Sequence, residues 1–110
     1  MNEAIQKAKE FVNKVREIRK SIIINVDEKT SEELGMEITE LRRRKRMANE
    51  MLNADACIRA NEMKKSGYTN SEIAKLFNES EGYIRYVLGK DEDVARAIIE
   101  IYAKKLGYVS

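Results

Sequence analysis

The sequence predicts an all-α protein. Proline, the residue that most often breaks helices, is absent from the 110 residues, and glycine occurs only five times. Apolar residues recur three and four positions apart over most of the chain, which is the spacing of one helix face. Residues that favour the starts and ends of helices punctuate this pattern. With 43% apolar and 36% charged residues, the composition is that of a folded chain.

The composition also argues against several classes of function. Cys57 is the single cysteine and histidine is absent, so we expect no zinc site and no Ser–His or Cys–His catalysis. We therefore expect no metal, no cofactor, no small-molecule substrate and no enzymatic activity. No stretch approaches the roughly 20 apolar residues that cross a bilayer, and the N-terminus lacks a secretory pattern. We expect no membrane partner and a cytoplasmic location, in a bacterium or a phage-infected cell.

The first helix is expected over residues 3–22. Its apolar positions follow the helical spacing and form one stripe: Ile5, Ala8, Val12, Val15 and Ile22, widened by Ala4, Phe11 and Ile18. This stripe fits packing within the domain, and it also fits a seam between copies in a homo-oligomer. The β-branched run from Ile22 to Val26 is interpreted as a frayed helix end and an apolar connection.

A second helix is expected after a turn at Asp27–Lys29. Thr30 and Glu33 form a capping-box pair, which is typical of a helix start, and Gly35 weakens the first turn. The apolar spacing then continues through Leu34, Ile38, Leu41, Ala48, Met51 and Leu52. Asn53 and Asp55 predict a break or bend near residue 53, although one unbroken helix from 31 to 66 is the alternative.

Three short helices are expected between residues 56 and 88. The first carries Ala56, Ala60 and Met63 on one face and ends at Gly67, a residue suited to a left-handed stop. Thr69 and Glu72 form another capping box, which starts a helix through Phe77.

Asn78 then makes a tight turn, since asparagine tolerates positive φ. Ser80 caps the third helix, Glu81–Leu88, whose inner face is Ile84, Val87 and Leu88. Ala74 is small enough for the last two helices to cross closely. Three short helices, the last two joined by so tight a turn, predict a tri-helical core.

The C-terminal helix starts at Asp91, which caps it and is followed by two acids in the first turn. Lys104 and Lys105 suit its negative end, and Gly107 stops it. The expected buried stripe is Val94, Ala97, Ile98, Ile101, Tyr102 and Leu106.

The segment from Gly67 to Leu88, GYTNSEIAKLFNESEGYIRYVL, resembles the helix-turn-helix of resolvase/invertase and sigma-region-4-like proteins. In that family a small alanine, a turn residue and two inner apolar residues hold the helices, and Ala74, Asn78, Ile84 and Val87 match these positions. Asn78 replaces the usual glycine. Glu79 stands where the family is usually apolar, so we expect it to lean outwards or to pair with a base.

The resemblance covers residues 55–89, and residues 1–54 resemble no family that we can name. It implies a helix-turn-helix domain with a C-terminal helix over 54–110. Residues 1–53 are then an N-terminal helical arm, with a basic linker helix, that can serve oligomerisation.

The resemblance also implies binding to double-stranded DNA, with the third helix in the major groove and the second across the backbone. Arg85 can donate hydrogen bonds to guanine, and Glu81 can accept one from cytosine. The free amides at the start of the second helix can bind phosphate. The predicted DNA-binding residues of the motif are Thr69, Asn70, Ser71, Lys75, Ser80, Glu81, Gly82, Arg85 and Tyr86.

A basic run completes the predicted interface: Arg42, Arg43, Arg44, Lys45 and Arg46. It follows residues 27–40, which hold six acids and one lysine. The run therefore fits phosphate binding, and it also fits a solvated helix face paired with these acids. Because residues 54–90 hold six basic and five acidic residues, one copy of the motif is expected to bind DNA weakly.

Three functions fit these observations. The first is a small regulator of transcription, acting as a homo-oligomer through residues 3–22. The second is a viral or mobile-element accessory in DNA packaging or recombination, oligomeric like a small terminase subunit. The third is a structural adaptor whose motif contacts protein instead of DNA.

Overall fold

A computed structural model describes residues 2–109, and within this range the chain forms helices and no strand. The all-α prediction is confirmed. The helices are α1 (Asn2–Arg19), α2 (Val26–Leu34), α3 (Ile38–Lys65), α4 (Asn70–Phe77), α5 (Glu81–Leu88) and α6 (Glu92–Lys105).

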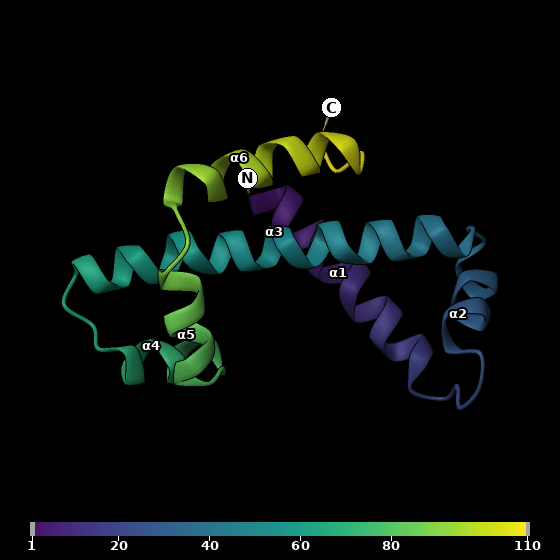
Figure 1. Cartoon of the computed structure of the whole chain (residues 1–110), viewed down its shortest axis with the longest axis horizontal. Coiled ribbons are helices and arrows are strands. Elements are labelled where there is room, and N and C mark those ends of the chain that lie inside the picture. Colours follow the sequence, from purple (N-terminus) through teal and green to yellow (C-terminus); the bar gives the residue numbers. More distant parts are fainter. Residues whose placement is uncertain (1, 110) are drawn as a thin grey trace.

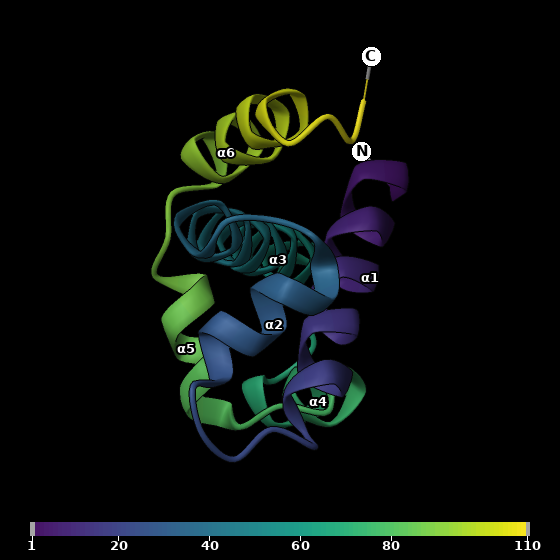
Figure 2. The ribbon, with the colours of Figure 1, turned by 90° about the vertical axis from the view of Figure 1, so that its right-hand side faces the viewer.

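The 28-residue helix α3 is the spine of the molecule. Helix α6 covers one side of it, while α1 and α2 lie beside its first half and α4 and α5 beside its last (Figure 1). The view along α3 shows it enclosed by α6, α1 and α5 (Figure 2). Met51 and Cys57 of α3 are fully buried in the core that these helices share, and Leu41, near the start of α3, is fully buried as well.

Helix α1 packs its apolar stripe into its own chain. Ala4, Ile5, Ala8 and Val15 are buried, and Ala4, Ile5 and Ala8 belong to the core that α3 shares. Packing within the domain is therefore the interpretation that the structure bears out. The helix ends at Arg19 rather than residue 22, because the β-branched run that follows loses side-chain freedom in a helix.

The expected turn at Asp27–Lys29 and the capping box at Thr30 and Glu33 are wrong. Helix α2 already starts at Val26, after Asn25 in the left-handed region with φ of 53°. Thr30 lies inside the helix, is fully buried, and donates from Oγ1 to the Val26 carbonyl oxygen at 2.6 Å. A hydroxyl that bonds to a carbonyl of its own helix can be buried mid-helix instead of capping an end.

The break expected near residue 53 is also wrong, because α3 runs unbroken from Ile38 to Lys65. Gly35 ends α2 at φ of 66° instead of weakening a first turn, so the interruption falls at residues 35–37. Asn53 is held by a side-chain hydrogen bond from α5, and Asp55 pairs with Arg59 one turn later at 2.8 Å. The expected domain boundary between residues 53 and 54 thus lies inside a helix.

The helix ends expected between residues 66 and 81 are confirmed. Gly67 is left-handed at φ of 96° and Asn78 at φ of 55°. Thr69 and Glu72 form both hydrogen bonds of the capping box. The Ser80 side chain accepts from the Tyr83 amide at 3.1 Å and so caps α5. Local capping chemistry therefore defines this region, since each cap satisfies amide groups that a helix end leaves free.

Helix α6 has the expected cap, because Asp91 Oδ1 accepts from the Val94 amide at 3.0 Å. Its expected buried stripe is confirmed at Leu106 and wrong at its other positions, which are half-buried or exposed. Ala95, Ile99, Ala103 and Leu106 are the buried residues. Of the expected set, Ile98 and Tyr102 are half-buried, while Ala97 is exposed and Val94 and Ile101 are 56% and 50% exposed. Two apolar stripes lie side by side on α6, and the alanines at 95 and 103 permit the close approach of the buried one to α3.

The substitution Ala74→Leu tests the packing of α4 on α5. Ala74 is 5% exposed, so three further carbon atoms have no free space, and we expect a loss of about 1–3 kcal/mol in the free energy of unfolding. Denaturant unfolding followed by circular dichroism measures it. The neighbouring exposed Lys75→Leu is the control and should stay within about 0.5 kcal/mol. Equal stability of the two variants would contradict this packing.

Candidate nucleic-acid interface

The inner face of α5 fixes its position on the rest of the molecule. Ile84 and Val87 are fully buried. Between them and the surface, the Tyr83 hydroxyl donates to Asn53 Oδ1 of α3 at 2.6 Å. Burial, the larger cause, and nearby Glu79 raise the pKa of Tyr83, which keeps this donor protonated. Helix α5 is thus tied to the middle of α3 by apolar packing and one directional hydrogen bond.

The outer face of α5 is polar and open to solvent. Glu81, Gly82, Arg85 and Tyr86 are exposed, together with the capping residue Ser80. Spacings of three and four residues put these side chains on one side of the helix. The α5 residues predicted to contact DNA therefore share one accessible surface.

Tyr86 lies at the edge of this surface. Its ring is 55% exposed and lies 4.5 Å from the Lys90 ammonium, a cation–π contact. Its ring centroid is 6.3 Å from that of Tyr83. Lys90 was not among the predicted site residues, although it follows Tyr86 by four residues, the spacing at which side chains at a helix end meet.

Gly82 is not required by the packing of this chain. A Cβ added there would meet only Arg85 Nη2 at 3.7 Å and Ser80 Oγ at 3.8 Å, which are ordinary contacts. Glycine in a helix weakens it by up to about 1 kcal/mol relative to alanine. The residue thus leaves α5 with a bare patch of backbone on its outer face, at some loss of helix stability.

Helix α4 places its first turn beside this surface. Ile73 and Ala74 are buried, and the Phe77 ring lies 4.4 Å below the Arg59 guanidinium of α3. Thr69 Oγ1 accepts from the Glu72 amide at 3.2 Å, and the Thr69 amide donates to Glu72 Oε1 at 3.0 Å. The backbone and side-chain hydrogen bonds with Thr69 lower the pKa of Glu72. The start of α4 is therefore held rigid.

The other residues predicted at α4 differ in accessibility. Ser71 and Lys75 are exposed. Asn70 is half-buried, and its Oδ1 is buried with no hydrogen-bond partner within the described range. Leu76, which was not predicted as a site residue, is 65% exposed. A leucine in a short amphipathic helix is normally expected to be buried, so its exposure was not predicted from the sequence.

Helix α4 and the first turn of α5 together form one end of the molecule, on the side of α3 away from α6 (Figure 1). The predicted residues of the motif meet at this end. The capped N-terminus of α5 is the end of this helix that points away from α3 (Figure 1), and Ser80, Glu81 and Gly82 there are exposed.

The basic run lies at the other end of α3. At about 1.5 Å of rise per residue, Arg44 lies roughly 30 Å along the helix from Lys65, after which the chain enters α4. Four of its five members contact carboxylates: Arg42 and Lys45 contact Asp27, at 3.2 and 3.9 Å, and Arg43 and Arg44 contact Glu40, at 2.9 and 2.8 Å. Arg46 is exposed. The run is therefore largely paired with the acids that precede it.

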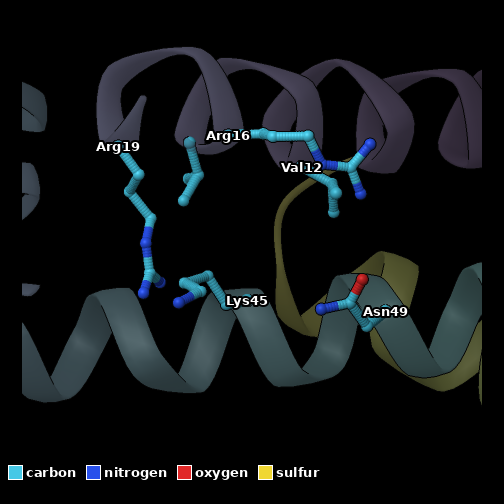
Figure 3. A pocket seen from close by; sticks show the side chains of 6 residues that line it. Val12, Arg16, Arg19, Lys45 and Asn49 are labelled. Atoms are coloured by element: carbon cyan, nitrogen blue, oxygen red, sulfur yellow. The ribbon is translucent and has the colours of Figure 1, made fainter. Parts of the chain in front are cut away.

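Lys45 lies beside a cavity of about 260 Å³ between α1 and α3 (Figure 3). Arg16 and Arg19 extend into this space from α1, and Asn49 from α3. Burial, the larger cause, and the Arg19 guanidinium lower the pKa of Lys45. Arg19 also contacts Asp27 at 3.3 Å. The two α1 arginines were not predicted, because they join Lys45 only when α1 folds against α3.

Other kinds of site find little support in residues 2–109. No cluster of three Cys, Asp or Glu side chains there could hold a metal ion, and no helix there is long and apolar enough to cross a bilayer. Cys57 is fully buried. Burial raises the pKa of its thiol, so this cysteine is a poor nucleophile.

Comparisons of the chain with protein families, with curated proteins and with solved structures find no match. The interpretation of this surface therefore depends on its own geometry.

Tyr83→Phe tests the hydrogen bond that holds α5. Removing the hydroxyl leaves Asn53 Oδ1 without its donor, and we expect a loss of about 0.5–1.5 kcal/mol in the free energy of unfolding. Tyr86→Phe removes a hydroxyl from the exposed ring on the same helix and is the matched control, with a change below about 0.5 kcal/mol. Chemical denaturation of both variants measures the difference, and equal losses would show that the bond is unimportant.

Proposed function

We propose that this chain binds double-stranded DNA through a tri-helical helix-turn-helix unit, formed by the last part of α3 with α4 and α5, and that it is a small regulator of transcription. One observation carries the proposal. The outer face of α5, from Ser80 to Arg85, is polar, exposed and rigidly supported, and it is bare of side chain at Gly82.

In this proposal the first turn of α5 enters the major groove. Arg85 donates to guanine O6 and N7 or to a phosphate, and Glu81 accepts from cytosine N4. Gly82 allows the helix backbone to approach the base edges. The start of α4, with Thr69, Ser71 and Lys75, lies on the phosphate backbone, where the free amides of a helix N-terminus favour anions.

The basic run has a smaller part in this proposal than its charge indicates. Neutralised phosphates determine how steeply DNA affinity falls with salt. Arg42 to Lys45 already contact Asp27 and Glu40, so these cations must leave their partners before they add to that dependence. Arg46 is the member of the run best placed to reach a phosphate.

A homo-oligomer remains part of the proposal, because a nearly neutral unit is expected to bind weakly as a single copy. Residues 3–22 offer a second copy little apolar surface, since their stripe packs within the chain. The interface therefore lies elsewhere or uses only the end of this segment, where Ile23, next in sequence, is 94% exposed. A ring-shaped assembly would favour the DNA-packaging accessory over the regulator.

One observation favours the adaptor as a second candidate. Leu76 and Tyr68, at 65% and 42% exposed, put apolar surface on and beside α4. Apolar side chains contribute little to phosphate contacts but are common in protein interfaces. A Leu76→Ser variant that keeps its DNA affinity and loses a protein partner would support the adaptor.

Arg85→Ala tests the DNA proposal directly. We expect specific binding to weaken by about 1–3 kcal/mol, with an unchanged melting temperature, because the side chain is exposed. Affinity is measured by fluorescence anisotropy on a duplex selected from a random pool, at several salt concentrations. Lys14→Ala, an exposed cation of α1, is the control and keeps wild-type affinity. Equal affinities for both variants would move the contact surface away from α5.

Gly82→Ala tests the effect of one added methyl group on fold stability and on DNA affinity separately. The added methyl group has space within the chain and improves helix propensity, so the melting temperature should stay equal or rise. In the complex the same methyl group stands between helix and base pairs, and we expect DNA affinity to fall by about 1–3 kcal/mol. Thermal unfolding and anisotropy on one sample measure both effects. Undiminished affinity would exclude close approach at this position.

A further inference from the structure

Helix α6 carries a second apolar stripe that residues 2–109 cover only at Ile98, which is half-buried against the core. Ala95, Ile99 and Ala103 face the core. The outer stripe lies next to them at the same helical spacing: Val94, Ala97, Ile98 and Ile101. Its two ends, Val94 and Ile101, are 56% and 50% exposed.

An amphipathic helix on a protein surface normally has one apolar stripe and a polar opposite face. Two adjacent stripes indicate two packing partners, because a contiguous exposed apolar strip is uncommon in a monomer. The first partner is α3. The spacing of the outer stripe, three, one and three residues, is that of a helix which packs lengthwise on another helix.

The charges of α6 identify the second partner. Acids Glu92 and Asp93 lie in the first turn, next to the capping Asp91, and Lys104 and Lys105 lie in the last turn. Glu92 already contacts Lys65 and Arg96, and Lys104 contacts Glu100, so the charge that each end offers a partner comes mainly from Asp93 and Lys105. Two copies of α6 side by side in parallel would put like charges together at both ends. In the antiparallel arrangement, the acidic end of each copy meets the basic end of the other, and the helix dipoles also oppose each other favourably.

The stripe is also symmetric about its centre. Reversal of the helix exchanges Val94 with Ile101 and Ala97 with Ile98. Branched residues therefore remain at both ends of the stripe, and the small Ala97 remains beside the two-fold axis at its centre. A surface that is complementary to itself after reversal is what a two-fold dimer requires.

A groove continues this surface towards α5. It has a volume of about 340 Å³ and lies between α6, α3 and α5, with Tyr86 and Lys90 on its far wall and Val94 and Ile98 on its near wall. A 14-residue helix spans only about 21 Å, too short to bury the roughly 1,200 Å² of a stable interface by itself. Side chains of a partner helix that fill the groove enlarge the contact.

We propose that the outer stripe of α6 is the interface through which two copies of this chain pair, α6 against α6 in antiparallel orientation. The pairing stands on α6 alone, and only its consequence rests on the proposed DNA binding. The dimer carries two copies of α5, which suits a DNA target with two half-sites.

The mass of the protein in solution tests the pairing. Sedimentation of the full chain from about 1 to 200 μM should approach twice 12.7 kDa at the upper end. Ile101→Asp should remain at 12.7 kDa throughout, with an unchanged circular dichroism spectrum, because this side chain is half exposed. Ile23→Asp is the matched control: this isoleucine is 94% exposed on the α1–α2 connection, and its variant should still dimerise.

A wild-type chain that is monomeric at every concentration would overturn the pairing. So would a dimer that survives Ile101→Asp, or one lost only in Ile23→Asp.

Cross-linking tests the orientation. An oxidised equal mixture of Val94→Cys and Ile101→Cys should form the mixed disulfide, while Val94→Cys alone should form little, since identical positions near the helix ends are too far apart for a disulfide in the antiparallel pair. Efficient cross-linking of Val94→Cys with itself would overturn the orientation.

DNA binding is measured separately. A dimer that binds no DNA contradicts the proposed function and leaves the interface intact. A monomer that binds DNA contradicts the interface and leaves the proposed function intact.

Discussion

The burial of α3 on several sides is the constraint on which this structure depends. A helix with apolar residues around much of its circumference is stable in water only when neighbours cover each side. Leu41, Met51 and Cys57 are completely excluded from solvent. Their burial depends on the cover that α1, α2, α5 and α6 provide. α4, by contrast, packs mainly on α5. One long helix therefore organises the chain, and the surface of α4 and α5 is positioned by its second half.

Local chemistry made much of the second half predictable. Thr69, Asn78 and Ser80 act through hydrogen bonds or backbone preferences within a few residues of themselves, so their roles can be read from the sequence. α2 was mispredicted because Thr30 and Glu33 have the spacing of a capping box. Thr30 instead lies buried inside α2. This burial depends on residues distant in sequence, about which local spacing carries no information.

The register of α6 shows a second limit of sequence patterns. Two of the buried residues, Ala95 and Ala103, are alanines, and a count of large apolar side chains favours the neighbouring stripe, which has Val94, Ile98 and Ile101. Close approach of two helices favours small side chains instead. The choice between two adjacent stripes depends on the surface of α3, which is known only once the chain has folded. Likewise, the basic run reads as one patch in the sequence but winds around α3, where acids from α2 and its own first turn meet it.

The return of α6 across α3 has a consequence for the order of events during synthesis. The segment that contains α4 and α5 leaves the ribosome before α6 does, yet α3 keeps one side bare until α6 arrives. Lys7 Nζ donates to the Tyr108 carbonyl oxygen at 3.1 Å, so the residues that follow α6 also close against α1. A nascent chain that already displays α5 therefore still exposes apolar surface on α3, and it completes this core only once α6 has been made.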